Sequence, residues 1–345
     1  METNTVWKLL KDLSTKRGIT EISINGPKTV FVEREGKLIQ LAVELNNEDI
    51  NEFVQDLENE KAQRVGIEYN SSPILNTNLK DGSRVNIIKP PFTQETAAIS
   101  IRKYLQEIRT FESSDGIFGL YGKWVDFLKA CVRARANIII SGGTGSGKST
   151  LLNLLLQEVP IEQRVITIED TLELNFHLPN LVRLEAFSSG GSGIGLRELV
   201  INTLRMRPDR IIIGESRGEE FFDLLMAMNT GHDGSMSTIH ANSGSECLQR
   251  MESLFLMSGF DVPPRAIKKQ ISSGVDFIFQ IKRDKDGKRI VSEIVELTGM
   301  EADNILVSSI AKFDEDEQSL KQTAVTPTII ERLVKDGGLD EGFFA

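Results

Sequence analysis

The residues with the clearest chemistry lie in one glycine-rich stretch, Gly142–Ser149, which fits the pattern G-x-x-x-x-G-K-[ST]. Glycines let consecutive backbone N–H groups turn toward one centre and surround phosphate oxygens. In this pattern the lysine, Lys148, reaches the β- and γ-phosphates, and the hydroxyl of Ser149 holds Mg²⁺. We therefore expect a nucleotide site built from Gly142, Gly143, Thr144, Gly145, Ser146, Gly147, Lys148, Ser149 and Thr150.

The sequence on both sides of this stretch has the composition that a phosphate-binding loop requires. An apolar run, residues 137–140, precedes it, and a leucine-rich run, residues 151–156, follows it. This is the order strand, loop, helix, and the start of the helix adds its positive dipole end. The alternative is a surface loop that contains Gly-Lys by chance, and the two flanking runs argue against it. The sequence thus predicts that the chain binds a nucleoside triphosphate.

Hydrolysis of that nucleotide needs acidic groups near the phosphates, and two apolar runs end in carboxylates. Residues 211–213 lead into Gly214 and Glu215, and residues 165–168 lead into Glu169, Asp170 and Glu173. Ligands of open α/β sheets bind at the carboxyl ends of strands. Glu215 is expected to hold Mg²⁺ through water or to orient the attacking water. Glu169 and Asp170 are candidates for the metal and Glu173 for polarising water. Solvated surface acids remain the alternative for any one of them.

Two of the three histidines and several arginines complete the set of candidates. His232 and His240 bracket a predicted strand, where an imidazole could sense phosphate; ordinary histidines are the alternative, and a zinc site is a weaker one. Arginine can hold phosphate through two parallel hydrogen bonds. Any one arginine is more often a surface ion-pair partner. The arginines considered are Arg84 and Arg102 near the N-terminus and Arg205, Arg207 and Arg217 around the strand before Glu215.

Composition limits the class of protein. The 345 residues suffice for about two domains. The net charge of −10 argues against a broad nucleic-acid-binding surface, which is usually basic. Cys131 and Cys247 are far apart and indicate neither a zinc module nor a disulfide framework. With no signal-like N-terminus and no apolar run of about 18 residues, we expect a cytoplasmic protein that reaches membranes only through partners.

Element patterns predict two domains. Residues 1–110 alternate short strands and helices as a small α+β domain, residues 111–122 are rich in Gly, Ser and Asp and suggest a linker, and residues 123–345 form the second domain. In the second domain strands alternate with helices, which predicts a mostly parallel sheet covered on both faces. A hairpin is expected around Asp286-Gly287. The Gly/Ser stretch 188–195 is expected to be a flexible loop.

These motifs, in this order, resemble the secretion ATPase superfamily of type II and type IV systems, and most closely its CpaF-type (Tad/Flp pilus assembly) subfamily. The resemblance rests on four signatures: Gly142–Thr150 as Walker A, Ile168–Glu173 as the Asp box, Gly214-Glu215 as Walker B and Thr230–His240 as the His box. Stretches 20–27, 81–86 and 99–103 of the first domain fit as well, so that the resemblance covers roughly residues 15–300.

The resemblance implies a RecA-like P-loop NTPase domain preceded by a PAS-like domain, assembled as a homohexamer. It also implies that ATP hydrolysis with Mg²⁺ drives pilus assembly, retraction or secretion at an inner-membrane platform. It places Glu173, Glu215, His232 and His240 at catalytic positions and Arg84 and Arg102 where N-terminal arginines reach the phosphates. Residues 188–195 and the short N-terminal extension depart from this subfamily, and the cysteine module of some type II enzymes is absent.

Two other functions remain open from the sequence. One is a nucleotide-gated docking or regulatory ring that uses the same site but signals by conformation. The other is a RecA-like nucleic-acid translocase, which the acidic composition disfavours. A GTPase is disfavoured because no N-K-x-D motif occurs.

Overall fold

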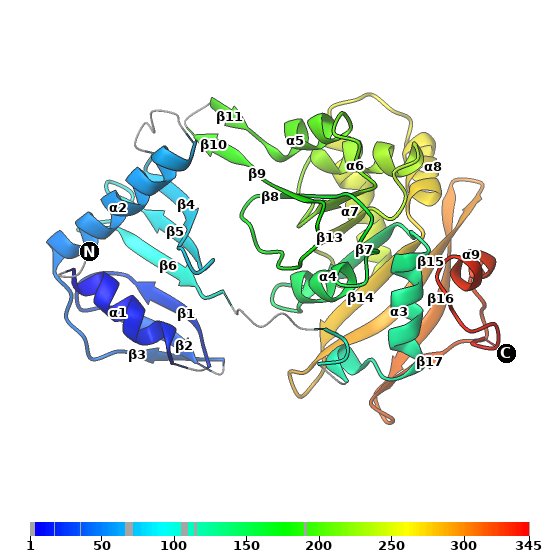
Figure 1. The fold of residues 1–345 in the computed structure, drawn as a ribbon, viewed down its shortest axis with the longest axis horizontal. Helices are drawn as coiled ribbons and strands as arrows, with labels where there is room; N and C mark the ends of the chain where they lie inside the picture. The colour runs from blue at the N-terminus through cyan, green and yellow to red at the C-terminus, as the bar shows by residue number, and fades with distance from the viewer. Residues whose placement is uncertain are drawn as a thin grey trace. The chain divides into compact units, whose positions relative to one another are not determined.

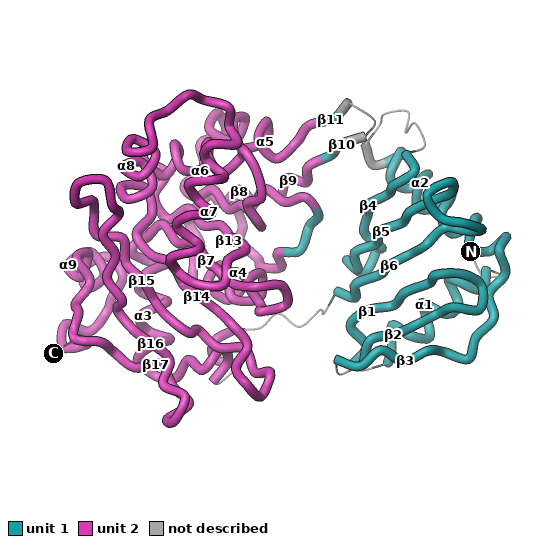
Figure 2. The backbone as a smooth tube through the Cα atoms, turned by 180° about the vertical axis from the view of Figure 1, so that it is seen from behind, with its two compact units in different colours: residues 1–107, 171–173, 187–193 teal, residues 108–170, 174–186, 194–345 magenta. Residues whose placement is uncertain are grey.

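The structure is a computed structural model that describes residues 4–16, 18–34, 36–65, 72–104, 110–113, 116–189 and 192–344. The chain divides into two compact units (Figure 2). The first unit comprises residues 1–107, 171–173 and 187–193, and the second comprises residues 108–170, 174–186 and 194–345. Within the described residues, no helix is both long and apolar enough to cross a membrane.

The first unit is an antiparallel sheet with two helices (Figure 1). Its strands follow the order β3-β2-β1-β6-β5-β4. The elements are α1 (Thr5–Ser14), β1 (Ile19–Ile24), β2 (Val30–Arg34), β3 (Lys37–Gln40), α2 (Asn47–Val65), β4 (Ile74–Asn78), β5 (Arg84–Ile88) and β6 (Ala98–Arg102).

Period-two alternation gives this sheet one apolar and one polar face. In β5 and β6 the side chains of Val85, Ile87, Ile99 and Ile101 are buried, in one core with apolar residues of both helices. The intervening side chains, which include Arg84 and Arg102, belong to the opposite face. This is the α+β domain that the alternating patterns predict.

The second unit is built on a nine-stranded sheet of order β17-β16-β15-β14-β7-β13-β12-β8-β9. Strands β14, β7, β13, β12, β8 and β9 are parallel, whereas β15, β16 and β17 extend the sheet in antiparallel fashion. The strands are β7 (Ile138–Gly142), β8 (Val165–Glu169), β9 (Leu181–Glu185), β12 (Arg210–Ile213), β13 (Met236–Ile239), β14 (Phe277–Arg283), β15 (Arg289–Glu301), β16 (Asn304–Asp314) and β17 (Ser319–Gln322).

Helices cover both faces of this sheet (Figure 1). Successive residues of β7 point to opposite sides: Ile138 and Ile140 join one core with α3 and α4, and Ile139 joins the other with α6 and α7. The helices are α3 (Lys123–Arg133), α4 (Lys148–Leu156), α5 (Leu196–Thr203), α6 (Glu220–Asn229), α7 (Gly244–Leu256), α8 (Pro264–Gly274) and α9 (Ile330–Lys335). The predicted fold class, a RecA-like α/β domain preceded by a smaller α+β domain, is therefore confirmed.

Two stretches differ from their sequence-based descriptions. Residues 111–122, which the composition suggests as a linker, lie within the second unit, where Phe111, Phe118 and Leu120 are buried in its core. The Gly/Ser stretch contains a small two-stranded sheet of β10 (Phe187–Ser189) and β11 (Ser192–Ile194); residues 190 and 191 lie outside the described residues. Aromatic burial and strand pairing override the loop-like composition in both places.

Candidate nucleotide site

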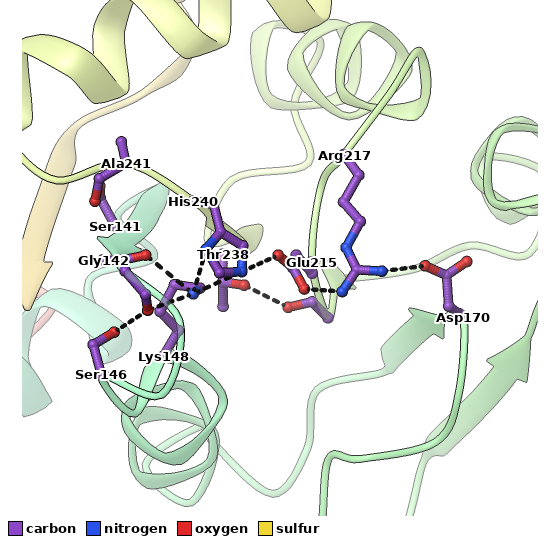
Figure 3. A network of polar contacts seen from close by, with 12 residues as sticks. Ser141, Gly142, Ser146, Lys148, Asp170, Glu215, Arg217, Thr238, His240 and Ala241 are labelled. Atoms are coloured by element: carbon purple, nitrogen blue, oxygen red, sulfur yellow. Dashed lines mark hydrogen bonds and ion pairs between the residues drawn. The ribbon is translucent and has the colours of Figure 1, made fainter. Parts of the chain in front are cut away.

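The phosphate loop connects β7 to α4, as the flanking sequences predict. Gly145 and Gly147 have positive φ values, +70° and +101°, which let the backbone curl before the helix begins at Lys148. The Lys148 side chain lies within the loop and is only 7% exposed. Its Nζ donates to the carbonyl oxygens of Gly142 and Gly143, at 3.1 Å each (Figure 3). The loop thus holds its ammonium group at the place where phosphates would bind.

Glu215 reaches the same edge of the sheet from β12, two strands away from β7. Gly214 N donates to Ile168 O of β8, and Gly214 O accepts from Thr238 Oγ1 of β13 at 2.9 Å. Ser216 N then donates to Thr238 O. These bonds hold the chain on both sides of Glu215, so its carboxylate is directed by two neighbouring strands.

His240, which directly follows β13, stands between the lysine and the carboxylate (Figure 3). Its Nε2 lies 2.8 Å from Glu215 Oε1, and its Nδ1 lies 3.4 Å from Lys148 Nζ. Its Nε2 also lies 3.2 Å from Lys148 Nζ, so the imidazole faces the ammonium group with both ring nitrogens and approaches the Glu215 carboxylate with Nε2. Burial and the adjacent Lys148 charge lower the pKa of His240, against the opposing effect of Glu215. Desolvation and charge therefore favour the neutral form at pH 7.

Arg217 extends this row of contacts toward β8. Its Nη2 lies 2.6 Å from Glu215 Oε2, and its Nη1 lies 3.7 Å from Asp170 Oδ2. Figure 3 shows the row Asp170, Arg217, Glu215, His240 and Lys148 across the carboxyl edge of the sheet. Asp170 thus faces an arginine, and the carboxylate of Glu215 is held from both sides.

Glu169, a predicted metal ligand, is the last residue of β8 and is buried. Its side chain is 2% exposed, and its Oε2 accepts from Leu174 N at 2.8 Å. Thr167 Oγ1 lies 3.3 Å from Oε1, and Arg183 Nη2 lies 3.9 Å from the same oxygen. A carboxylate that accepts from the chain five residues later fixes the loop after β8. In this structure Glu169 therefore contacts the loop after β8, and its role as a metal ligand stays a prediction.

Arg84 and Arg102 are direct cross-strand partners on β5 and β6 of the first unit. They line, with Glu21 and Thr171, a hollow of about 230 Å³. Arg84 Nη1 lies 2.5 Å from Glu173 Oε1, and Arg102 Nε lies 3.8 Å from Glu21 Oε1. Glu173 belongs to the short segment that clusters with the first unit. The structure therefore brings together three of the predicted site residues here.

His232 is not brought to the phosphate loop of its own chain. It precedes β13, whereas His240 follows it, and β13 is parallel to β7. A four-residue strand rises about 13 Å. His232 therefore lies beyond the amino end of β13, and His240 lies beyond its carboxyl end, where the phosphate loop is. His232 N donates to Ala227 O, and its carbonyl accepts from Ser235 Oγ. The length of β13 therefore separates His232 from His240, although the two histidines belong to one sequence motif.

The chemistry at the edge suits Mg²⁺ bound together with phosphates. Ser149 is the second residue of α4, so its hydroxyl belongs to the turn that follows the phosphate loop; Glu215 adds carboxylate oxygens. Among the described residues, no three His, Cys, Asp or Glu side chains gather as a metal-binding group. Mg²⁺ prefers oxygen ligands and is commonly held by one or two protein groups, with phosphates and water supplying the rest. The residues present fit this pattern.

Residues of the hairpin between β14 and β15 also adjoin the phosphate loop, which the sequence analysis missed. Arg283 Nη2 lies 3.8 Å from the position that a Cβ on Gly145 would take. Arg289 Cδ lies 2.9 Å from the equivalent position on Gly147, beside Phe118. The hairpin itself is predicted by Asp286-Gly287, but its neighbour in the sheet is not, because β14 pairs with β7 across more than 130 residues of sequence.

Comparison with known proteins gives the family. Residues 6–322 match the family described as Type II/IV secretion system protein. A putative conjugal transfer protein of Mycobacterium tuberculosis (strain ATCC 25618 / H37Rv) is 31% identical over 299 residues, or 84% of each chain. The type IV secretion system protein VirB11 of Bartonella quintana is 31% identical over 325 residues, which cover 83% of this chain and 89% of VirB11.

A solved structure agrees at the level of the fold. The ATPase DotB of Legionella pneumophila has a TM-score of 0.60 at 19% identity, with 91% of this chain and 82% of DotB covered. The family match over residues 6–322 includes residues of both units and the whole phosphate loop. The chain therefore belongs to the type II/IV secretion system protein family, within the secretion ATPase superfamily.

Proposed function

We propose that this protein is a Mg²⁺-dependent ATPase. The observation that carries the proposal is the convergence of Lys148, His240 and Glu215 at the carboxyl edge of the parallel sheet. A cation, a neutral imidazole and a carboxylate follow one another there, beside a loop with the backbone shape for phosphate. Phosphoryl transfer depends mainly on positioning and on electrostatic stabilisation, which this set can supply.

Each residue has a distinct role in this proposal. Lys148 leaves the carbonyls of Gly142 and Gly143 and contacts the phosphates, where its charge stabilises the γ-phosphoryl group. Glu215 orients the attacking water. His240 lies between Glu215 and Lys148, and its neutral form avoids charge repulsion with Lys148. Mg²⁺, when bound through Ser149, neutralises phosphate charge.

The residues of the first unit take a second role. We propose that Arg84 and Arg102 bind phosphate oxygens and that Glu173 polarises water when nucleotide is bound. Their cross-strand pairing and the ion pair of Arg84 with Glu173 support a common action. His232 lies at the amino ends of the strands, away from the phosphate loop of its own subunit. In this proposal it acts at the nucleotide site of another subunit.

The motor function is the finer part of the proposal. Family membership and the printed descriptions of relatives as conjugal transfer and type IV secretion system proteins support a role in secretion. We propose a homohexamer at the cytoplasmic face of the inner membrane that drives Tad/Flp-type pilus assembly or retraction, or secretion, through membrane platform proteins and without nucleic acid. We keep the proposed domains as residues 1–110 and 123–345; residues 111–122, proposed as their connection, are packed with the second unit in this structure.

The test separates binding from hydrolysis with two variants. Lys148→Ala is expected to abolish ATP binding and phosphate release, because the phosphates lose their buried cation. Glu215→Gln is expected to bind ATP within a few-fold of the unaltered protein but to hydrolyse it about 10²- to 10⁴-fold more slowly, the range for a positioned general base. Fluorescent-nucleotide titration and phosphate release measure the two effects. Phosphate release that persists in Lys148→Ala would contradict the proposal.

A further inference from the structure

The hairpin of β14 and β15 is joined to the phosphate loop by direct strand pairing. β14 pairs with β7 in parallel as far as Ile281, which lies opposite Gly142. The carbonyl oxygen of Ile281 lies 2.7 Å from the position of a Cβ on Gly142, so only glycine fits this approach. Because β14 ends two residues later at Arg283, the hairpin turn begins beside the loop that would surround the phosphates.

Arg283 is held at a defined place by this turn. Its Nη1 donates to Gly287 O at 2.9 Å, across the turn. Asp284 Oδ1 accepts from Asp286 N and Lys288 N, which fixes the turn itself. The other terminal nitrogen of the guanidinium group, Nη2, lies beside Gly145 at the apex of the phosphate loop. The preceding residue, Lys282, is the one that pairs with a carboxylate: its Nζ lies 3.6 Å from Glu315 Oε1.

Arg289 acts on the same loop through packing. Its Cδ lies 2.9 Å from the Cβ position of Gly147, the residue before α4, and the Phe118 ring touches the same place. The Arg289 stem and the Phe118 ring therefore border Gly147, whose positive φ sets the turn into the helix. Both ends of the hairpin turn thus adjoin glycines of the phosphate loop.

We propose that Arg283 is a nucleotide-binding residue that contacts the polyphosphate chain, and that Arg289 is a positioning residue for Gly147. The inference rests on the proposed ATP-binding function. A guanidinium group suits this role because its planar set of N–H donors can pair with two phosphate oxygens. Lys148 supplies a single ammonium group from α4, and Arg283 adds a second cation from β14. Binding would use the outer edge of the guanidinium group while Nη1 keeps its bond to Gly287.

The experiment compares Arg283→Gln with Lys285→Gln in the full chain. Lys285 is an exposed lysine of the same turn, so both variants lose one positive charge there. Isothermal titration at fixed salt measures the affinities for Mg-ATP and for inorganic tripolyphosphate. Arg283→Gln is expected to weaken both by about tenfold, the loss of one charge-assisted contact. Lys285→Gln is expected to stay within about twofold, and Arg283→Lys to fall between Arg283→Gln and the unaltered protein.

The outcomes are distinct. Equal losses in Arg283→Gln and Lys285→Gln mean that only the general charge of the turn matters, and they overturn the inference. A loss for ATP with unchanged tripolyphosphate affinity places Arg283 at the nucleoside and also overturns it. If the unaltered protein binds no ATP, or if Lys148→Ala binds it equally well, the proposed function fails, and this inference fails with it. Thermal unfolding of each variant checks that the fold is retained.

Discussion

At the scale of single residues, the candidate site is a row of alternating partners rather than a set of independent groups. Glu215 has His240 on one oxygen and Arg217 on the other, and His240 adjoins Lys148. Replacing one member therefore changes the charge and the hydrogen bonds of its neighbours. We expect the effects of double substitutions within this row to be non-additive, as is usual for residues in contact.

His240 gives a pH prediction at this scale. Its pKa is lowered in the folded protein, so the unfolded chain binds more protons in the window below the usual value of 6.5. Stability then rises with pH through that window and is lost as the pH falls below 6.5. The unfolding temperature of the unaltered protein should fall more between pH 7.5 and 5.5 than that of His240→Gln. Scanning calorimetry measures both; identical pH dependence would show that His240 does not contribute.

At the scale of elements, the shape of the phosphate loop depends on where glycine is required. Gly147 has φ +101°, and a Cβ there would lie 2.9 Å from both Phe118 Cζ and Arg289 Cδ. Gly287, in the turn between β14 and β15, also has a positive φ, +79°, but has nothing within 4 Å of its Cβ position. An alanine at either position would have a strained backbone, but only an alanine at Gly147 would also collide with neighbouring side chains. Comparing the two substitutions therefore separates the effect of strain from the effect of crowding.

This contrast predicts a graded loss of stability. Gly287→Ala should destabilise the protein by about 1 kcal/mol, the cost of a left-handed conformation for alanine. Gly147→Ala carries the same strain and also displaces Phe118 or Arg289, so we expect a loss of about 2–4 kcal/mol together with weaker ATP binding. Denaturant unfolding and nucleotide titration provide the measurements. Equal losses of stability in the two variants would rule out crowding at Gly147.

At the scale of the whole molecule, the proposed motor depends on assembly. The first unit carries Arg84 and Arg102, and the second carries Lys148 and Glu215. His232 lies at the edge of its sheet away from its own phosphate loop. We propose that a ring of subunits combines these residues in shared nucleotide sites.

Assembly predicts that ATP hydrolysis per protomer rises with protein concentration and then reaches a plateau. The rise should coincide with a shift from monomer to hexamer in sedimentation velocity, because each site would be completed by a neighbour. Lys148→Ala serves as the control for contaminating activity. Full activity in a species that sediments as a monomer would contradict the assembly proposal.

Much of the fold and of the site could be predicted from local sequence. The phosphate loop, the strands that lead to Glu169 and Glu215, the position of His240 and the hairpin at Asp286-Gly287 all follow from short patterns. Apolar runs, glycines and turn residues determine the conformation of their immediate neighbours in the chain. The elements that they form can therefore be predicted without knowledge of the rest of the molecule.

Only the tertiary structure decided which of these residues meet. The direction of β13 places His232 and His240 at opposite ends of that strand. Glu169 accepts a hydrogen bond from the loop after β8. Pairing of β14 with β7 brings Arg283 and Arg289 next to the phosphate loop. Pairing of strands far apart in sequence depends on packing of the whole sheet, and no local pattern specifies it. The sequence by itself determined the chemical groups available, and the order of the strands determined which of them act together.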